Sequence, residues 1–146
     1  MFEYYDNNIL EILEKKQNGI PKPFIIKYIY QVVKGLKFMH EHGYIHRDVK
    51  PENLLVNSEH VIKICDMGFA RNYNFNEKLT EYVATRWYRS PELLFAIKYT
   101  FAIDIWATGC LMAELVDGNP LFPGADEIDQ IKQIQDFFGV KIRKSG

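Results

Sequence analysis

Eight consecutive residues, His46 to Asn53, hold the side chains best suited to chemistry in this 146-residue sequence. They read His-Arg-Asp-Val-Lys-Pro-Glu-Asn. Asp48 can accept a proton, Lys50 can neutralise phosphate charge, and Asn53 can hold a metal ion through its carbonyl oxygen. A base, a cation and an oxygen ligand this close together indicate chemistry on a phosphate group. The alternative interpretation is a polar surface loop that turns at Pro51.

A second candidate metal ligand follows a short apolar run. Residues 61–65 read Val-Ile-Lys-Ile-Cys, and Asp66-Met67-Gly68 comes directly after them. An aspartate at the end of a buried strand, followed by glycine, resembles the metal-binding Asp-Phe-Gly of protein kinases, whereas the same tripeptide alone would be an ordinary turn. Its position thirteen residues after Asn53 favours the metal-binding interpretation.

A β hairpin is predicted to bring the two candidate ligands together. Leu54-Leu55-Val56 and residues 61–65 are β-prone runs that flank a polar turn at residues 57–60. In a hairpin, Asn53 at the start of one strand lies close to Asp66 beyond the end of the other. Two oxygen ligands from different loops suit Mg²⁺, which takes its remaining ligands from water and substrate phosphates.

Helices are predicted to form the scaffold around this site. Residues 24–42 show apolar side chains at alternating steps of four and three, with Pro23 in the first turn and Gly43 just past the end. A shorter helical segment precedes them and stops at Gly19 and Pro21. Residues 103–116 are apolar almost all round, as in a buried central helix. A last helix is predicted over residues 126–138, with its inward positions at Ile128, Ile131, Ile134 and Phe138.

Composition and charge place the chain among globular proteins. It is 47% hydrophobic and 25% charged, with a net charge of −1, so nothing in the total suggests nucleic acid or an anionic membrane as a partner. Cys65 and Cys110 both sit in apolar runs, which favours reduced, buried thiols and an intracellular location in cytoplasm or nucleus; a disulfide stays open. No apolar run reaches transmembrane length, and residues 1–6 carry acids and no basic leader, so no secretory signal is expected.

Residues 69–92 lack sustained periodicity and instead combine hydroxyl groups with arginines. Thr80 and Tyr82 are followed by Arg86 and Arg89. A phosphate on either hydroxyl gains charge-assisted bonds to arginine and can order a loop. This pattern predicts a phosphorylation switch, and the alternative is a solvated loop that happens to contain a threonine and a tyrosine.

Together these motifs resemble a eukaryotic Ser/Thr protein kinase of the cyclin-dependent and mitogen-activated group, closest to the cyclin-dependent kinase-like family. His-Arg-Asp-x-x-x-x-Asn has the spacing of the kinase catalytic loop, and Asp66-Met67-Gly68 resembles Asp-Phe-Gly. Nearly the whole chain takes part, from the hinge-like residues 1–6 onward. The other matching motifs are Thr80-Glu81-Tyr82, Ser90-Pro91-Glu92 in place of Ala-Pro-Glu, Asp104-Ile105-Trp106-Ala107-Thr108-Gly109 and Pro120-Leu121-Phe122-Pro123-Gly124.

The resemblance implies a role for each matching residue, and it implies ATP and Mg²⁺ as cofactors. Asp48 would be the catalytic base, and Lys50 would bind the transferring phosphate. The implied metal ligands are Asn53 and Asp66; the implied adenine contacts are Glu3, Tyr5 and Leu55; and the implied regulatory residues are Thr80, Tyr82, Arg47, Arg86 and Arg89, with Thr85 shaping the substrate pocket. For Glu3 and Tyr5, a plain strand-to-helix connection is an equally good interpretation.

The departures from the family pattern limit what the chain is expected to do alone. No Gly-x-Gly-x-x-Gly and no Val-Ala-Ile-Lys-like strand occur in residues 1–146. The expected fold is therefore mainly α with short β hairpins, the large C-terminal lobe of the kinase fold without its small lobe, as one partial kinase domain over residues 1–146. The expected partners are a protein substrate and an upstream activating kinase, and a cyclin-like partner stays open. The alternative function is a non-catalytic interaction module that keeps the kinase lobe for docking.

Overall fold

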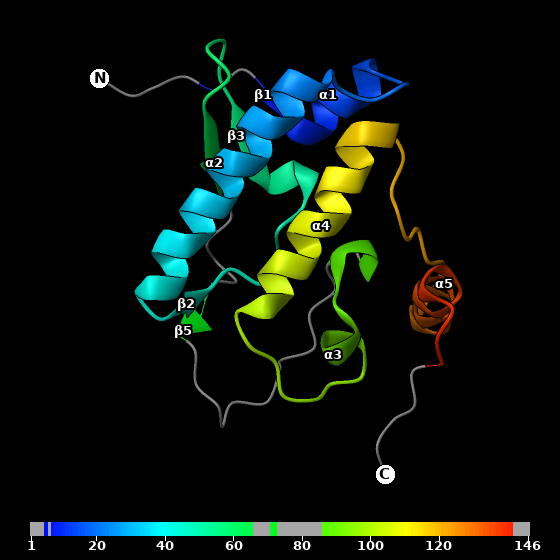
Figure 1. The fold of residues 1–146 in the computed structure, drawn as a ribbon. Helices are drawn as coiled ribbons and strands as arrows, with labels where there is room; N and C mark the ends of the chain where they lie inside the picture. The colour runs from blue at the N-terminus through cyan, green and yellow to red at the C-terminus, as the bar shows by residue number, and fades with distance from the viewer. Residues whose placement is uncertain (1–4, 6, 66–70, 73–85, 142–146) are drawn as a thin grey trace.

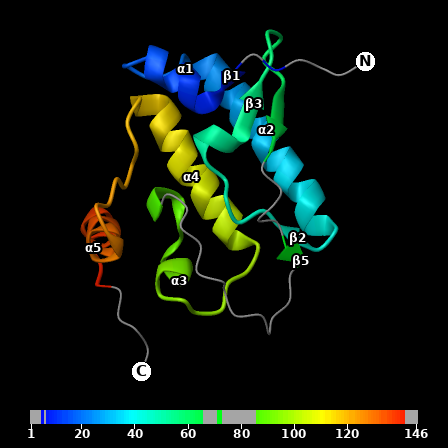
Figure 2. The ribbon, with the colours of Figure 1, turned by 180° about the vertical axis from the view of Figure 1, so that it is seen from behind.

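The computed structural model describes residues 5, 7–65, 71–72 and 86–141. Figure 1 shows two long helices, α2 (Lys22–Glu41) and α4 (Ala102–Asp117), side by side, with the small β elements and α1 (Ile9–Lys15) around them. Figure 2 shows the same neighbourhood from behind, with α5 (Glu127–Phe138) on the far side of α4 from α2. Among the described residues, no helix is both long and apolar enough to cross a membrane.

The first two helices form where the periodicity predicts them. Asn8 caps α1, since its side-chain oxygen accepts a hydrogen bond from the backbone N–H of Glu11 at 2.9 Å. The helix α2 begins at Lys22, has Pro23 in its first turn and ends next to Gly43, which takes a φ of 80°. Ile25, Val32, Leu36 and Met39 are buried as expected, and Tyr28 is buried with them.

Two small antiparallel sheets connect the helices to the loops. In the first sheet the strand order is β1 (Asn7–Asn8), β3 (Leu54–Val56) and β4 (Ile62–Ile64), and Leu54 pairs with Ile64. The predicted hairpin is therefore confirmed. The second sheet pairs β2 (Tyr44–Ile45) with β5 (Arg71–Asn72). The sequence analysis missed β1, β2 and β5, because strands of two residues are too short to show periodicity.

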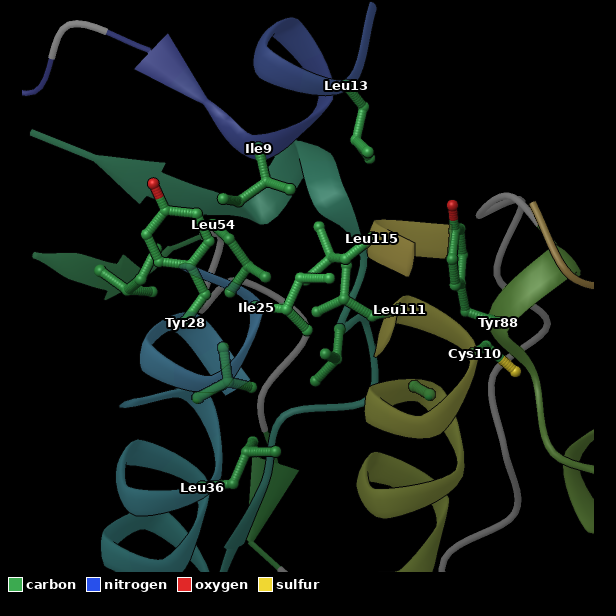
Figure 3. Packing of buried hydrophobic residues seen from close by; sticks show 14 of the residues in the cluster. Ile9, Leu13, Ile25, Tyr28, Leu36, Leu54, Tyr88, Cys110, Leu111 and Leu115 are labelled. Atoms are coloured by element: carbon green, nitrogen blue, oxygen red, sulfur yellow. The ribbon is translucent and has the colours of Figure 1, made fainter. Parts of the chain in front are cut away.

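The hydrophobic core lies where α1, α2, β3 and α4 meet. Figure 3 shows Ile9 and Leu54 pointing toward the space between α2 and α4, where Ile25 faces Leu111 and Leu115. The side chains of Leu36 and Leu111 have no exposed surface at all. Burial of these aliphatic groups is the main source of stability for such a core.

The chain after α4 is tied back to the residues just before α3 (Pro91–Leu94). Arg86 donates from Nη1 to the carbonyl oxygen of Ala125 at 3.2 Å, and Trp87 donates from Nε1 to that of Gly124 at 3.0 Å. Gln130 of α5 accepts a hydrogen bond from the backbone N–H of Gly124 on Oε1, at 3.0 Å. These bonds fix the loop before α5 against the short 3₁₀ helix at Arg86–Tyr88.

Two predictions about buried helix faces are wrong. The helix α4 is not buried all round, because it exposes one stripe made of Ala102, Ile105, Gly109, Met112 and Val116, which we call the outward stripe. On α5, Ile134 is buried but Ile128 is 81% exposed and Phe138 is 54% exposed. Ile128 and Ile134 are six positions apart and so point about 120° away from each other around the helix. The apolar pattern alone could not tell which of these faces has a neighbour in the chain.

The cysteines differ in their surroundings. Both are free, and Cys110 is buried as predicted, whereas Cys65 is only half-buried. Burial raises the pKa of the Cys110 thiol to about 12, with a smaller contribution from the nearby Glu114 carboxylate. Cys110 is therefore a packed, unreactive side chain of the core.

Candidate active site

The loop between β2 and β3 holds the predicted catalytic residues, and two of them have buried polar side chains. Asp48 is 5% exposed and Asn53 is 6% exposed, and both side chains stay paired. The chain reaches this arrangement through Arg47, which has a φ of 75°. A positive φ is rare outside glycine and costs about 1 kcal/mol or more, so other contacts must hold it.

Asp104 of α4 supplies those contacts. Its Oδ1 accepts the backbone N–H of Arg47 at 2.9 Å, and its Oδ2 accepts the backbone N–H of His46 at 2.8 Å. His40, in the last turn of α2, lies 2.8 Å from the same Oδ2 through its Nε2. Asp104 is only 1% exposed, and its carboxylate satisfies donors from two elements at once. One buried side chain thus fixes the start of the catalytic loop against both long helices.

His46 links the catalytic loop to the end of β4. Its Nδ1 accepts the backbone N–H of Asp48 at 3.1 Å, so its Nε2 carries the proton and donates to the carbonyl oxygen of Cys65 at 2.9 Å. The backbone N–H of Cys65 donates in turn to the carbonyl oxygen of Asn53 at 2.8 Å. The chain just before Asp66 is therefore bonded to both ends of the catalytic loop, although Asp66 itself lies outside the described residues.

Lys50 and Asn53 both contact the carboxylate of Asp48. The amide nitrogen of Asn53 donates to the backbone oxygen of Asp48 at 2.8 Å and to its Oδ2 at 3.0 Å. The ammonium of Lys50 lies 3.5 Å from Oδ1 of Asp48 and 3.9 Å from Oε2 of Glu52. Because the amide nitrogen of Asn53 is committed twice to Asp48, its Oδ1 is the atom left to hold a cation. This donor set fits Mg²⁺, a hard ion that prefers oxygen ligands.

The remaining predicted residues that the structure describes lie in other parts of the chain. Leu55, in β3, is half-buried and pairs with Asn8, and Tyr5 is half-buried just before β1. The guanidinium of Arg47 lies over the ring of Tyr99, 5.8 Å from its centroid. Arg86 contacts the loop before α5, as described above, and Arg89 lies 4.0 Å from Glu127. The predicted residues outside the described ranges are Glu3, Asp66, Thr80, Tyr82 and Thr85.

A buried tyrosine–carboxylate pair beside the loop was missed by the sequence analysis. The hydroxyl of Tyr88 donates to Oε1 of Glu114 at 2.5 Å, inside the core. Burial and the bond to Glu114 together raise the pKa of Tyr88. Burial raises the pKa of Glu114, the bond from Tyr88 opposes that shift, and the carboxylate of Glu52 in the catalytic loop adds to it. A glutamate within the largely apolar residues 103–116 was the available signal for this contact.

The fold and the catalytic loop are compatible with part of a protein kinase domain. The sequence matches the protein kinase domain family over residues 1–145, so the chain belongs to that family. It is 51% identical to mouse cyclin-dependent kinase-like 5 over 95% of the chain. It is also 49% identical to rat cyclin-dependent kinase-like 2 over 95% of the chain, and 48% identical to mouse cyclin-dependent kinase-like 4 over 90%. The chain spans only 15%, 28% and 39% of these relatives respectively.

Proposed function

We propose that residues 1–146 act as the large lobe of a Ser/Thr kinase, which transfers the γ-phosphoryl group of ATP to hydroxyl groups of protein substrates. Membership of the kinase family and the similarity to cyclin-dependent kinase-like proteins support the class of reaction. The single observation that carries the proposal is the pair of bonds from Asn53 to Asp48, at 2.8 and 3.0 Å. They hold a proton acceptor beside a cation-binding oxygen, as phosphoryl transfer to a hydroxyl requires.

Each residue of this centre has one task in the proposed reaction. Asp48 accepts the proton of the attacking hydroxyl, and the bonds from Asn53 fix the direction of its carboxylate. Lys50, 3.5 Å from that carboxylate, places positive charge beside the phosphate that is transferred. Asn53 and Asp66 would hold Mg²⁺, which when bound neutralises charge on the ATP phosphates. Glu3, Tyr5 and Leu55 are proposed to contact the adenine.

Phosphorylation of Thr80 and Tyr82 by an upstream kinase is proposed to switch the enzyme on. Arg47 supports this coupling, because it precedes Asp48 directly and its backbone N–H is held by Asp104. A phosphate that draws the Arg47 guanidinium would act on the chain next to the base. Arg86 and Arg89 are the proposed cations for the Tyr82 phosphate. Full activity of a Thr80→Ala/Tyr82→Phe double variant would exclude the switch.

Asp48→Asn tests the reaction itself. Since residues 1–146 contain no Gly-rich loop and no strand lysine, we expect negligible turnover from this chain alone with MgATP and a basic protein substrate. The test therefore joins residues 1–146 behind the ATP-binding lobe of a cyclin-dependent kinase-like relative. Turnover of this chimera should fall by ~10²–10⁴-fold in Asp48→Asn, because asparagine cannot take the proton, while ATP affinity changes little.

Asp136→Asn, at an exposed position of α5, is the matched control and should keep the activity of the unmodified chimera. Full turnover of the Asp48→Asn chimera would contradict the proposed base. Turnover of ~1 s⁻¹ from residues 1–146 alone, the low end for kinases, would contradict the need for the other lobe.

A non-catalytic docking role is the second candidate, and the outward stripe of α4 favours it. Ile105, Met112 and Val116 are 51%, 46% and 57% exposed and lie on one helix face. Exposed apolar surface of this kind marks interaction sites. An inactive chimera that still binds a partner through α4 would favour this role over catalysis.

A further inference from the structure

A groove of about 440 Å³ lies beside the start of α2, and none of residues 46–53 lines it. Its walls come from α1, the first turns of α2 and the β3–β4 turn. The apolar part includes Ile12, Phe24 and Val56, and the polar part includes Lys15, Lys16 and His60. This volume falls within the range of ~300–1,000 Å³ that is typical of small-molecule sites, which are also mainly apolar with a few polar groups.

The wall formed by the β3–β4 turn is held in place before any ligand arrives. The hydroxyl of Tyr28 is bonded to Nδ1 of His60 at 2.6 Å, and the His60 ring lies 4.5 Å from that of Phe24. Gln31 donates from Nε2 to the backbone oxygen of His60 at 3.0 Å. His60 keeps a φ of 61°, an uncommon conformation that these contacts stabilise. A preformed groove binds a ligand with little ordering cost.

The polar groups of the groove select for negative charge. Lys15 and Lys16 contribute two ammonium groups, and no aspartate or glutamate is among the lining residues. When Tyr28 donates to Nδ1, neutral His60 carries its proton on Nε2 and adds a further donor. Apolar walls beside lysines favour a ligand that is apolar along its body and anionic at one end.

We propose that this groove binds a small amphipathic carboxylate, an apolar chain or ring system with one anionic head group. The apolar body lies against Ile12, Phe24 and Val56, and the carboxylate meets Lys15 and Lys16. A cationic head group on the same body meets two ammonium groups and is disfavoured. The site is distinct from the ATP and substrate contacts proposed above, because it shares none of their residues.

The proposed site is tested on residues 1–146 with two ligands that share a ten-carbon alkyl chain and carry head groups of opposite charge. Decanoate and decyltrimethylammonium are titrated below their micelle concentrations by calorimetry. Decanoate should bind at least ~10-fold more tightly than the cation, a difference of one charge-assisted contact. Lys15→Glu/Lys16→Glu should reverse that preference. Lys34→Glu/Lys37→Glu makes the same change of charge on the exposed face of α2 and should leave the preference intact.

Ring resonances of Phe24 and His60 in proton NMR localise the ligand, and both should shift with decanoate. Equal binding of the two amphiphiles, or the same effect from both double variants, would overturn the proposal. Shifts confined to the methyl groups of Ile105 and Met112 would also overturn it, since they place the ligand on the outward stripe. The proposal would also be overturned if decanoate did not bind at millimolar concentration.

Discussion

The two long helices, α2 and α4, lie side by side (Figure 1). They differ in the kinds of side chain that they expose to water and bury in the core. The exposed face of α2 mixes apolar side chains such as Ile26 and Tyr30 with Lys27, Lys34 and Lys37. The outward stripe of α4 contains no polar side chain at all. Conversely, α4 buries Asp104, Thr108 and Glu114, whereas the buried residues of α2 are hydrophobic with one tyrosine.

This difference shows that different requirements selected the residues of the two helices. The outer face of α2 suits a surface helix, with lysine heads in water and stems along the apolar groups. Each inward polar group of α4 makes a specific bond: Asp104 accepts from the catalytic loop, Glu114 accepts from Tyr88, and Thr108 donates to the backbone of α4 itself. The apolar side chains of its outward stripe form no hydrogen bonds with water, and such exposed surface suits contact with another protein.

Removal of the buried Asp104 carboxylate of α4 should lower the free energy of unfolding more than the other changes. Asp104→Ala leaves the backbone N–H groups of His46 and Arg47 without an acceptor, and unsatisfied buried donors cost ~1–3 kcal/mol each. We expect the free energy of unfolding to fall by about 3 kcal/mol or more, as measured by urea denaturation. Asp117→Ala at the exposed end of α4 is the control. A loss below ~1 kcal/mol for Asp104→Ala would show that the loop does not depend on α4.

Charges on the outward stripe should weaken self-association. We expect residues 1–146 to associate through exposed apolar surface, and Ile105→Lys/Met112→Lys should lower the association constant by at least ~10-fold, since burial of one such side chain contributes more than 1.4 kcal/mol. Sedimentation at several concentrations measures this constant. Ile26→Lys/Val33→Lys on α2 is the matched control and should have a smaller effect. Equal effects of both pairs would remove the contrast between the helices.

Glu114 should make stability depend on pH. Burial raises its pKa in the folded chain above the value in the unfolded chain, so the folded state binds the proton more tightly. Its contribution is complete below the ordinary pKa and is lost as pH rises through the raised one. Glu114→Gln keeps an acceptor for Tyr88 but cannot titrate, so its unfolding free energy should vary less with pH across that window. Urea denaturation at a series of pH values checks this, and parallel curves for both chains would contradict it.

The smallest effect is expected on the outer face of α2. Lys37 and Glu41 form an exposed pair at 3.6 Å, and their side chains are 74% and 59% exposed. Lys37→Ala should change the unfolding free energy by no more than ~0.5 kcal/mol, because exposed i,i+4 pairs contribute little. Thermal denaturation in low and high salt measures it. A loss comparable to that of Asp104→Ala would mean that the surface of α2 matters as much as the interior of α4.

Much of the fold could be predicted because its signals are local. The apolar steps of residues 24–42 define α2, the runs flanking residues 57–60 define the β3–β4 hairpin, and Gly43 marks the end of α2. The spacing of Asp48, Lys50 and Asn53 likewise identified three side chains that the structure brings together. Local patterns succeed here because turns and helical periodicity depend on residues a few positions apart.

The sequence by itself determined which residues are candidates for the chemistry and which segments become helices. Only the tertiary structure decided what holds the chemistry in place: Asp104 reaches His46 across 58 positions, and Tyr88 reaches Glu114 across 26. It also decided that Ile128 and the stripe of α4 face outward, and that α1, α2 and the β3–β4 turn enclose a groove. These features depend on how α2 and α4 pack, and an apolar side chain has the same sequence pattern whether or not a neighbouring element covers it.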